Sequence, residues 1–268
     1  MSDRLKIIKD QSWKLKNTIA KEDWISIKYL VNAMCEPFDQ EKIATRCVEK
    51  ATPGSKYWGM TVEEVIAKWN EYSQNRTITG MTFDTYTQFK LTNTPCTLGD
   101  NITDEQKLIF NHFDQLKEYV LDKEHDIKGE KATMEYLGSE IWVSSPTGIR
   151  GKMDSLFWLL NGYVVWDWKN FDVPNDGFTR MLGPLSSLKN SDFNKATLQL
   201  YLYKYILETD YELPVSGVRI GMVNKNCWNV IKPTFKYDTK LMNEIIDFGK
   251  NVIINQRKEQ EIKGHGIS

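Results

Sequence analysis

The chain has 268 residues, of which 41% are apolar and 26% charged, and its net charge is −1. This composition can bury a sizeable core, in one domain or in one domain with an extension. The near-neutral charge excludes a global positive field, so any binding of nucleic acid must depend on a local basic patch. No apolar run approaches the roughly 20 residues of a membrane span, and no secretory leader is evident. We therefore expect a soluble, intracellular, cytoplasmic protein with no membrane partner.

The first 58 residues are predicted to form a helical extension, and residues 59–268 a second domain. The segment 52–59 contains proline and glycine, and it predicts a break in regular structure between the two. Apolar side chains of the extension that we expect to be buried are Trp13, Trp24, Ile27 and Leu30.

Two helices are predicted at the start of the second domain. Thr61 with Glu64 forms a capping box, and Thr103 with Gln106 forms a second one. Each box precedes apolar residues at helical spacing, so we expect a helix after each.

From about residue 133 the pattern changes to short β-branched and aromatic runs. The runs EIWVSS (140–145), GIRGKMDSLFWLL (148–160) and GYVVWDWKNF (162–171) predict three strands. The Asn161–Gly162 pair between the last two runs predicts a hairpin.

The remaining elements complete the fold class. Residues 194–208 are apolar nearly all round, as in a helix packed against a sheet. A strand over 215–224 and a helix over about 239–256 follow. The order of elements predicts an α/β core with a mixed sheet rather than a doubly wound one.

Asp167 and Lys169 end the second arm of the predicted hairpin. Residues two apart on a strand share a face, so these side chains project together while Trp166 and Trp168 point into the core. Pairing of the two arms brings Asp154 towards Asp167. Converging carboxylates repel, but a hard divalent cation such as Mg²⁺ or Mn²⁺ would remove that repulsion. The lysine would then orient an attacking water or stabilise negative charge on a phosphate.

A purely structural alternative is a salt bridge from Asp167 to Lys169 or Arg150. It explains the charged pair but leaves Asp154 without a role. It also leaves unexplained the polar residues Gln199 and Tyr203, which share one face of the apolar helix.

The motifs Glu140, Gly151-x-x-Asp154, Asp167-Trp168-Lys169 and Gln199-x-x-x-Tyr203 occur in that order along the chain. Together they resemble the PD-(D/E)XK nuclease superfamily, in its RecB-like and phage or viral exonuclease branch, and are similar to the mitochondrial genome maintenance exonucleases. The resemblance covers residues 57–235. It implies a restriction-endonuclease-like core and Mg²⁺- or Mn²⁺-dependent hydrolysis of DNA, favouring an exonuclease over an endonuclease. Replication, recombination and end processing are the implied contexts.

The resemblance also implies roles for individual residues. Asp154 and Asp167 match the metal-binding carboxylates, and Lys169 matches the catalytic lysine. Glu140 matches an acidic position upstream, for which Glu135 competes; Glu140 is favoured because it immediately precedes the Ile-Trp-Val run. The motif residues that would support the site or touch DNA are Gln199 and Tyr203.

One segment departs from the family pattern. The family carries a Gly-Thr-x-x-His-x-x-x-Glu helix before the core, whereas GMTFDTYTQ (80–88) places Asp84 at the histidine and Gln88 at the glutamate. Because aspartate can bind Mg²⁺, Asp84 is predicted as a further metal ligand. The alternative is a catalytically impaired module that binds nucleic acid or a protein partner.

The expected partners are single- or double-stranded DNA ends and replication or recombination proteins. Three basic residues lie beside the predicted helix that carries Gln199 and Tyr203, namely Arg180, Lys189 and Lys195. They form either a surface that binds the phosphates of the DNA backbone or an ordinary solvated face. The Lys-, Asn- and Ile-rich composition fits an AT-rich viral or phage genome, whose product would act in the host cytoplasm.

The cysteines predict no further cofactor. Cys35, Cys47, Cys96 and Cys227 are scattered without Cys-x-x-Cys spacing, and they are expected as free thiols in a reducing compartment. Four cysteines could hold an iron–sulfur cluster, but this spacing argues against it and none is expected.

Overall fold

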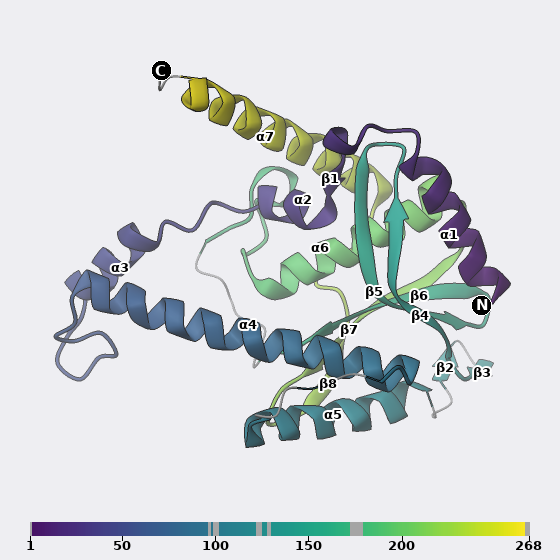
Figure 1. Cartoon of the computed structure of the whole chain (residues 1–268), viewed down its shortest axis with the longest axis horizontal. Helices are drawn as coiled ribbons and strands as arrows, with labels where there is room; N and C mark the ends of the chain where they lie inside the picture. The colour runs from purple at the N-terminus through teal and green to yellow at the C-terminus, as the bar shows by residue number, and fades with distance from the viewer. Residues whose placement is uncertain are drawn as a thin grey trace.

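The computed structural model of the protein describes residues 2–95, 98, 102–121, 125–127, 130–171 and 179–265. An open mixed sheet is flanked by helices on both faces (Figure 1). This arrangement confirms the predicted α/β class and the mixed sheet.

The described residues form eight strands. Their bounds are β1 (Ile25–Ser26), β2 (His125–Ile127), β3 (Glu130–Ala132), β4 (Glu135–Ser144), β5 (Ile149–Leu159), β6 (Gly162–Lys169), β7 (Val215–Val223) and β8 (Trp228–Ile231). The main sheet has the order β1-β5-β6-β7-β8, and β4 also pairs with β5. The pairs β1–β5 and β6–β7 are parallel and the others antiparallel, while β2 and β3 form a separate hairpin.

Helices cover both faces of the main sheet. Their bounds are α1 (Asp3–Lys16), α2 (Ile27–Ala33), α3 (Gln40–Glu49), α4 (Val62–Thr92), α5 (Asp104–Leu121), α6 (Asp192–Tyr205) and α7 (Thr239–His265), with short turns at Lys21–Asp23, Gly183–Leu185 and Ile206–Asp210. One core lies between the sheet and α1, α2, α6 and α7. The other lies between the sheet, α5 and the C-terminal half of α4. Among the helices that the structure describes, none combines the length and apolar character needed to cross a membrane.

Local sequence signals account for several elements. In both predicted capping boxes the first threonine and the third following residue exchange hydrogen bonds, Thr61 with Glu64 and Thr103 with Gln106. The predicted hairpin is also present, because β5 and β6 pair in register up to Leu159 and Gly162. These signals depend on contacts between residues three or four apart, so tertiary packing does not override them.

The N-terminal residues contribute to the main sheet and its core. β1 pairs with β5, and the predicted Trp24, Ile27 and Leu30 are buried. The expectation for Trp13 is wrong, because 64% of this residue is exposed. The buried face of α1 consists of Leu5, Ile8 and Ser12, so the next residue points away from the core.

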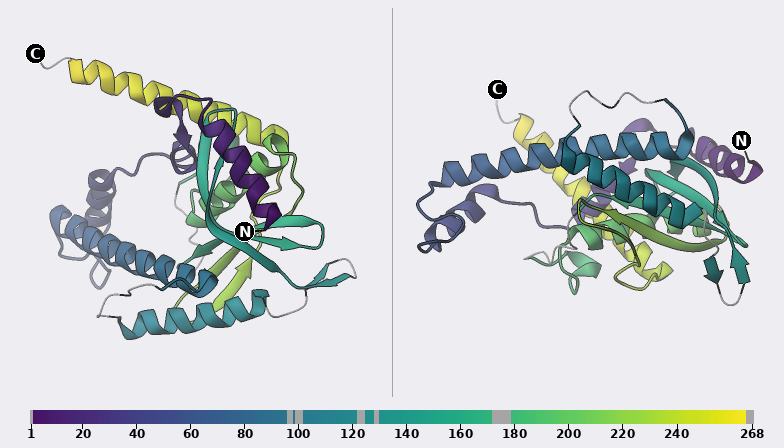
Figure 2. Two further views of the ribbon diagram at one scale, coloured as in Figure 1. Left: turned by 45° about the vertical axis from the view of Figure 1, so that its right-hand side comes forward. Right: turned by 90° about the horizontal axis from the view of Figure 1, so that it is seen from below.

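The segment from α3 into α4 projects from the body of the molecule. α3 packs against α4, and Figure 2 shows the two helices extending beyond the sheet. The boundary predicted at residues 58 and 59 falls in the connection that leads into α4. α1, β1 and α2 share the main core with the strands of the second predicted domain. The division of the chain into two domains at this boundary stays a prediction.

Candidate active site

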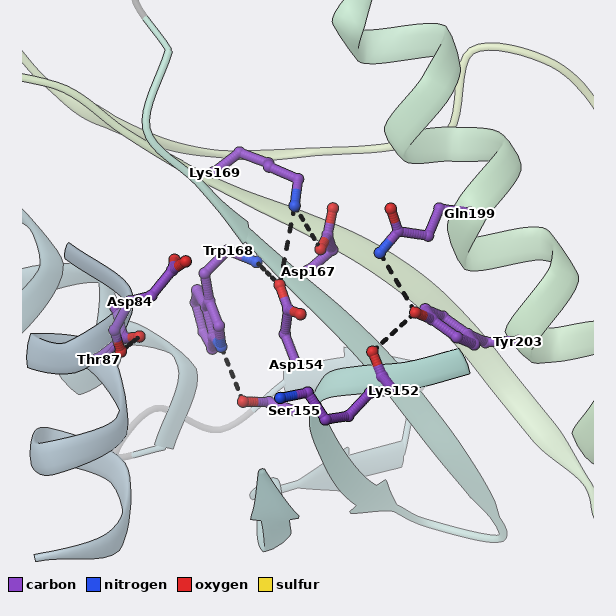
Figure 3. A network of polar contacts seen from close by, with 10 residues as sticks. All are labelled: Asp84, Thr87, Lys152, Asp154, Ser155, Asp167, Trp168, Lys169, Gln199 and Tyr203. Atoms are coloured by element: carbon purple, nitrogen blue, oxygen red, sulfur yellow. Dashed lines mark hydrogen bonds and ion pairs between the residues drawn. The ribbon is translucent and has the colours of Figure 1, made fainter. Parts of the chain in front are cut away.

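Three charged side chains from β5 and β6 meet between α4 and α6 (Figure 3). Lys169 Nζ lies 2.8 Å from Asp167 Oδ1 and 3.8 Å from Asp154 Oδ2. The backbone N–H of Trp168 donates to Asp154 Oδ2 at 3.4 Å, which ties the end of β6 to the neighbouring strand. The structure thus brings together the three residues that the hairpin pattern predicted.

The opposite face of β6 is anchored by tryptophans. Trp166 and Trp168 are buried and stack with ring centroids 5.0 Å apart. The indole Nε1 of Trp168 donates to Ser155 Oγ at 2.8 Å. Because successive strand residues alternate between faces, this anchoring fixes the direction of Asp167 and Lys169.

Asp167 is the buried member of the charged group. It is 1% exposed, and its Oδ2 has no hydrogen-bond partner among the described residues. Burial raises the pKa of Asp167 well above its ordinary value; Asp154 raises it further, while Lys169 opposes both. A buried carboxylate oxygen without a partner is costly, so a cation or a proton at this position would be stabilising.

Lys169 is held as a cation. Burial alone would lower the pKa of its ammonium group, but Asp167 and Asp154 raise it by more, and the net shift is upward. The protonated amine can donate hydrogen bonds and stabilise negative charge. It is a poor general base, because it holds its proton too tightly at neutral pH.

Asp84 approaches the same group from α4. Figure 3 shows its carboxylate directed towards Lys169 and Asp154. The residue is solvent-exposed, but the protein around its carboxylate removes part of its hydration. This desolvation and the charge of Asp154 raise the pKa of Asp84 to about 6, against the opposing charges of Lys169 and Lys152.

The carboxylates of the site could provide part of the ligand set of a hard divalent cation. Asp154 and Asp167 offer carboxylate oxygens, one of them buried and without a partner. No cluster of three or more His, Cys, Asp or Glu side chains within the described ranges has the spacing of a metal site. Mg²⁺ needs only one or two protein carboxylates when waters and substrate phosphates complete its shell. Asp154 and Asp167 fit that mode, and Asp84, predicted as a further ligand, is directed towards the same group (Figure 3).

Gln199 and Tyr203 reach β5 from α6. The Gln199 amide donates to the Tyr203 hydroxyl at 3.3 Å, and that hydroxyl donates to the carbonyl of Lys152 at 2.7 Å. A Cβ on Gly151 would lie 2.7 Å from the Tyr203 ring and 2.9 Å from the Ile27 side chain. The glycine therefore admits the tyrosine ring to the strand.

Glu140 lies at the edge of the charged group rather than within it. The β4–β5 register pairs its two neighbours in β4 with the residues that flank Asp154, but its own carboxylate forms an ion pair with Lys152. Its backbone has a φ of 56°, which is rare for a residue with a side chain. The competing Glu135 binds Arg4 instead, so of the two glutamates only Glu140 adjoins the site.

The comparisons with known proteins identify no family. No protein-family model matches the chain, and no curated protein matches its sequence.

The basic residues predicted beside α6 have different roles. Lys195 lines a groove of about 1420 Å³ between α2, α3, α4 and α7, and it pairs with Asp192. Arg180 donates to the carbonyl of Ser187, and it forms an isolated β-bridge with Lys189. Only Lys195 of the three predicted basic residues therefore lines the groove.

Sequence reasoning missed most of this groove. Its cations are Arg46, Lys50, Lys56, Lys195 and Arg257. Its aromatic residues are Tyr29, Phe38, Tyr57 and Trp69. One acidic residue, Glu36, lies among the lining residues. No local pattern joins residues so far apart in the chain. Arg46 of α3 and Lys50, which caps the C-terminus of that helix, are four residues apart and could have been noticed.

The groove and the charged group share two helices. Trp69 in the groove and Asp84 at the site both belong to α4, about 22 Å apart along the helix axis at 1.5 Å per residue. On α6, Lys195, Gln199 and Tyr203 follow one another at four-residue spacing, and so lie on one face.

Three of the four cysteines lie within the part of the chain that the structure describes. Cys35, Cys47 and Cys227 are free thiols, and Cys96 lies outside the described residues. Cys35 and Cys47 line the groove, whereas Cys227 does not.

Proposed function

We propose that the protein is a divalent-metal-dependent nuclease that hydrolyses phosphodiester bonds of DNA, on a restriction-endonuclease-like core of the PD-(D/E)XK type. The observation that carries this proposal is the meeting of Asp154, Asp167 and Lys169, with one buried oxygen of Asp167 left without a partner. The ordered motifs along the chain support the same superfamily.

Each residue has a chemical task in this proposal. Asp154 and Asp167 hold the cation, and Asp84 adds negative charge next to it. A bound Mg²⁺ or Mn²⁺ supplies positive charge that makes water a stronger nucleophile and offsets charge on the phosphate. Lys169, held protonated, donates to the attacking water or to a phosphate oxygen.

The α6 residues position β5 rather than react. Through the hydrogen bond to the Lys152 carbonyl, Tyr203 fixes the strand two residues before Asp154. Gln199 fixes the tyrosine hydroxyl in turn. Loss of either residue would move Asp154, and small displacements of catalytic groups strongly reduce rates.

The groove supports nucleic acid as the substrate. Its lining combines five cations with four aromatic rings, the combination that binds phosphates and stacks bases. Two helices connect it to the charged group. An exonuclease is the preferred form, acting on DNA ends with replication or recombination proteins, in the cytoplasm of a cell or of a viral host.

A digestion assay tests the proposal. Linear DNA labelled at its 5′ or 3′ end and covalently closed circles are incubated with the protein and Mg²⁺, Mn²⁺ or a chelator. We expect products from linear DNA that need the cation, and none from circles. Products from circles would mean that the protein is an endonuclease rather than an exonuclease. Products in the presence of the chelator would overturn the proposed metal dependence.

A binding module without turnover is the second candidate. The observation that favours it is the lack, within the described residues, of a cluster of three or more potential metal ligands. In the same assay, retention of DNA without any product, in both Mg²⁺ and Mn²⁺, would favour this candidate over the nuclease.

A further inference from the structure

A second, smaller pocket adjoins the charged group on the side of α4. Its volume is about 260 Å³, and it lies between α4 and β4. Thr85, which directly follows Asp84, lines it from the helix. Glu140, whose neighbours in β4 pair with the residues that flank Asp154, lines it from the strand. Two lining residues are thus neighbours of site carboxylates along the chain or across the strands, while Asp84, Asp154 and Asp167 do not themselves line the pocket.

Most residues that line this pocket have polar side chains, but the surface they present is largely apolar and carries no net positive charge. No lysine or arginine is among its lining residues, and the carboxylate of Glu140 is paired with Lys152. The hydroxyl of Thr85 donates to the carbonyl of Met81, and so keeps its lone pairs for an outside donor. The pocket therefore suits an uncharged group and not a phosphate.

Two residues give the pocket the chemistry of base recognition. The Gln88 amide makes no hydrogen bond to the described residues, and it offers both a donor and an acceptor. Phe89 supplies an aromatic surface one residue further along α4. An amide that can form paired hydrogen bonds beside an aromatic ring is the way that proteins read a base removed from its stack.

The size of the pocket limits the ligand. Sites for whole drug-sized ligands have volumes of about 300–1,000 Å³, so this pocket takes one ring system and not a base pair. Glu140, on the strand side of the pocket, has a φ of 56°, a positive value that it shares with three other non-glycine residues of the described chain.

We propose that this pocket holds one unpaired nucleobase of the substrate strand, next to the scissile phosphate. This inference rests on the proposed nuclease function and specifies its substrate: the nucleotide at the cut must be unpaired, in a single strand or at a frayed end. The base is recognised through Gln88 and Thr85, and the phosphate that follows it lies at Asp154 and Asp167.

The test uses full-length protein carrying Asp167→Asn, which removes cleavage and leaves the pocket unchanged. Single-stranded oligonucleotides carry 2-aminopurine at one nucleotide, moved one position at a time from each end. We expect a fluorescence change at one position, and about tenfold weaker binding when that nucleotide is abasic. Gln88→Ala and Thr85→Val should each remove the difference between base and abasic site.

Gln74→Ala is the matched control, because Gln74 is also an exposed glutamine of α4 but does not line the pocket. It should leave the fluorescence change intact. Equal binding of base-bearing and abasic strands at every position would overturn the pocket assignment, as would an unaltered response in Gln88→Ala.

Cleavage by the wild-type protein separates the two proposals. If it degrades DNA with equal rates for base-bearing and abasic strands, the nucleobase pocket is wrong and the nuclease stands. If it degrades nothing but the Gln88-dependent fluorescence change remains, the nuclease is wrong and the pocket stands as a binding site.

Discussion

Lys169 and Asp167 form an ion pair in which only the carboxylate is fully buried. The Nζ to Oδ1 distance is 2.8 Å, and the two side chains are 33% and 2% exposed. The cation therefore faces the open side of the site while the anion lies beneath it. Such a pair leaves the lysine able to reach a substrate, and it leaves the buried aspartate dependent on positive charge.

Removal of the lysine should destabilise the protein as well as inactivate it. Lys169→Met leaves the Asp167 charge buried without its nearest partner, and we expect a loss of about 2 kcal/mol in the free energy of unfolding. Urea denaturation measures it. The double variant Asp167→Asn/Lys169→Met should recover most of that stability but no activity. Equal stability of Lys169→Met and the wild type would mean that the pair is not energetically coupled.

The affinity for Mn²⁺ should depend on pH through Asp84. Its pKa of about 6 means that the ionised form, which attracts the cation, is lost as the pH falls through that value. Calorimetric titration at several pH values should show wild-type affinity declining below pH 6. Asp84→Asn should bind more weakly at neutral pH and change less with pH. An identical pH profile in the variant would remove Asp84 from the metal site.

The stability of the metal-free protein should fall as the pH rises. Asp167 and Asp84 have folded-state pKa values above the ordinary 3.8, so the folded state holds these protons more tightly than the unfolded state. Their contribution is fully present below about pH 4 and is lost as the pH rises through the folded-state pKa, about 6 for Asp84.

Asp167→Asn should remove much of this decline. The variant should exceed the wild type in free energy of unfolding at neutral pH without metal, and the difference should shrink towards about pH 4. Thermal denaturation across this range measures it. A wild type more stable than the variant at neutral pH in a chelator would show that the pKa of Asp167 is not raised.

Gly151 should be intolerant of a side chain. A Cβ there meets the Tyr203 ring at 2.7 Å, so we expect Gly151→Ala to lose about 1–3 kcal/mol and to displace the tyrosine. Gly80→Ala is the control: nothing lies within 4 Å of its Cβ, and alanine in the middle of α4 should add about 0.5–1 kcal/mol. Equal stability of the two variants would contradict the close approach of Tyr203.

The sequence predicted those parts of the site that depend on local geometry. Asp167 and Lys169 share a face because they are two residues apart on a strand, and the hairpin turn sets their distance from Asp154. The pairing of Gln199 with Tyr203 follows in the same way from helical spacing.

The rest depends on tertiary contacts that no local pattern records. Trp13 has helical spacing with buried residues, yet α1 packs on β4 through another face. β1 has only two residues, too few to carry a periodic signal. Glu140 was expected from its place before an apolar run, but its ion pair with Lys152 arises from the β4–β5 register.

The most direct test of the central claim compares two proteins on one substrate. Wild-type protein and Lys169→Met are each incubated with end-labelled linear DNA and Mn²⁺, and the rise in melting temperature with Mn²⁺ is measured in parallel. We predict that Mn²⁺ raises the melting temperature of both proteins, whereas only the wild type releases nucleotides. Equal rates of release from both proteins, or no release from the wild type, would contradict the account.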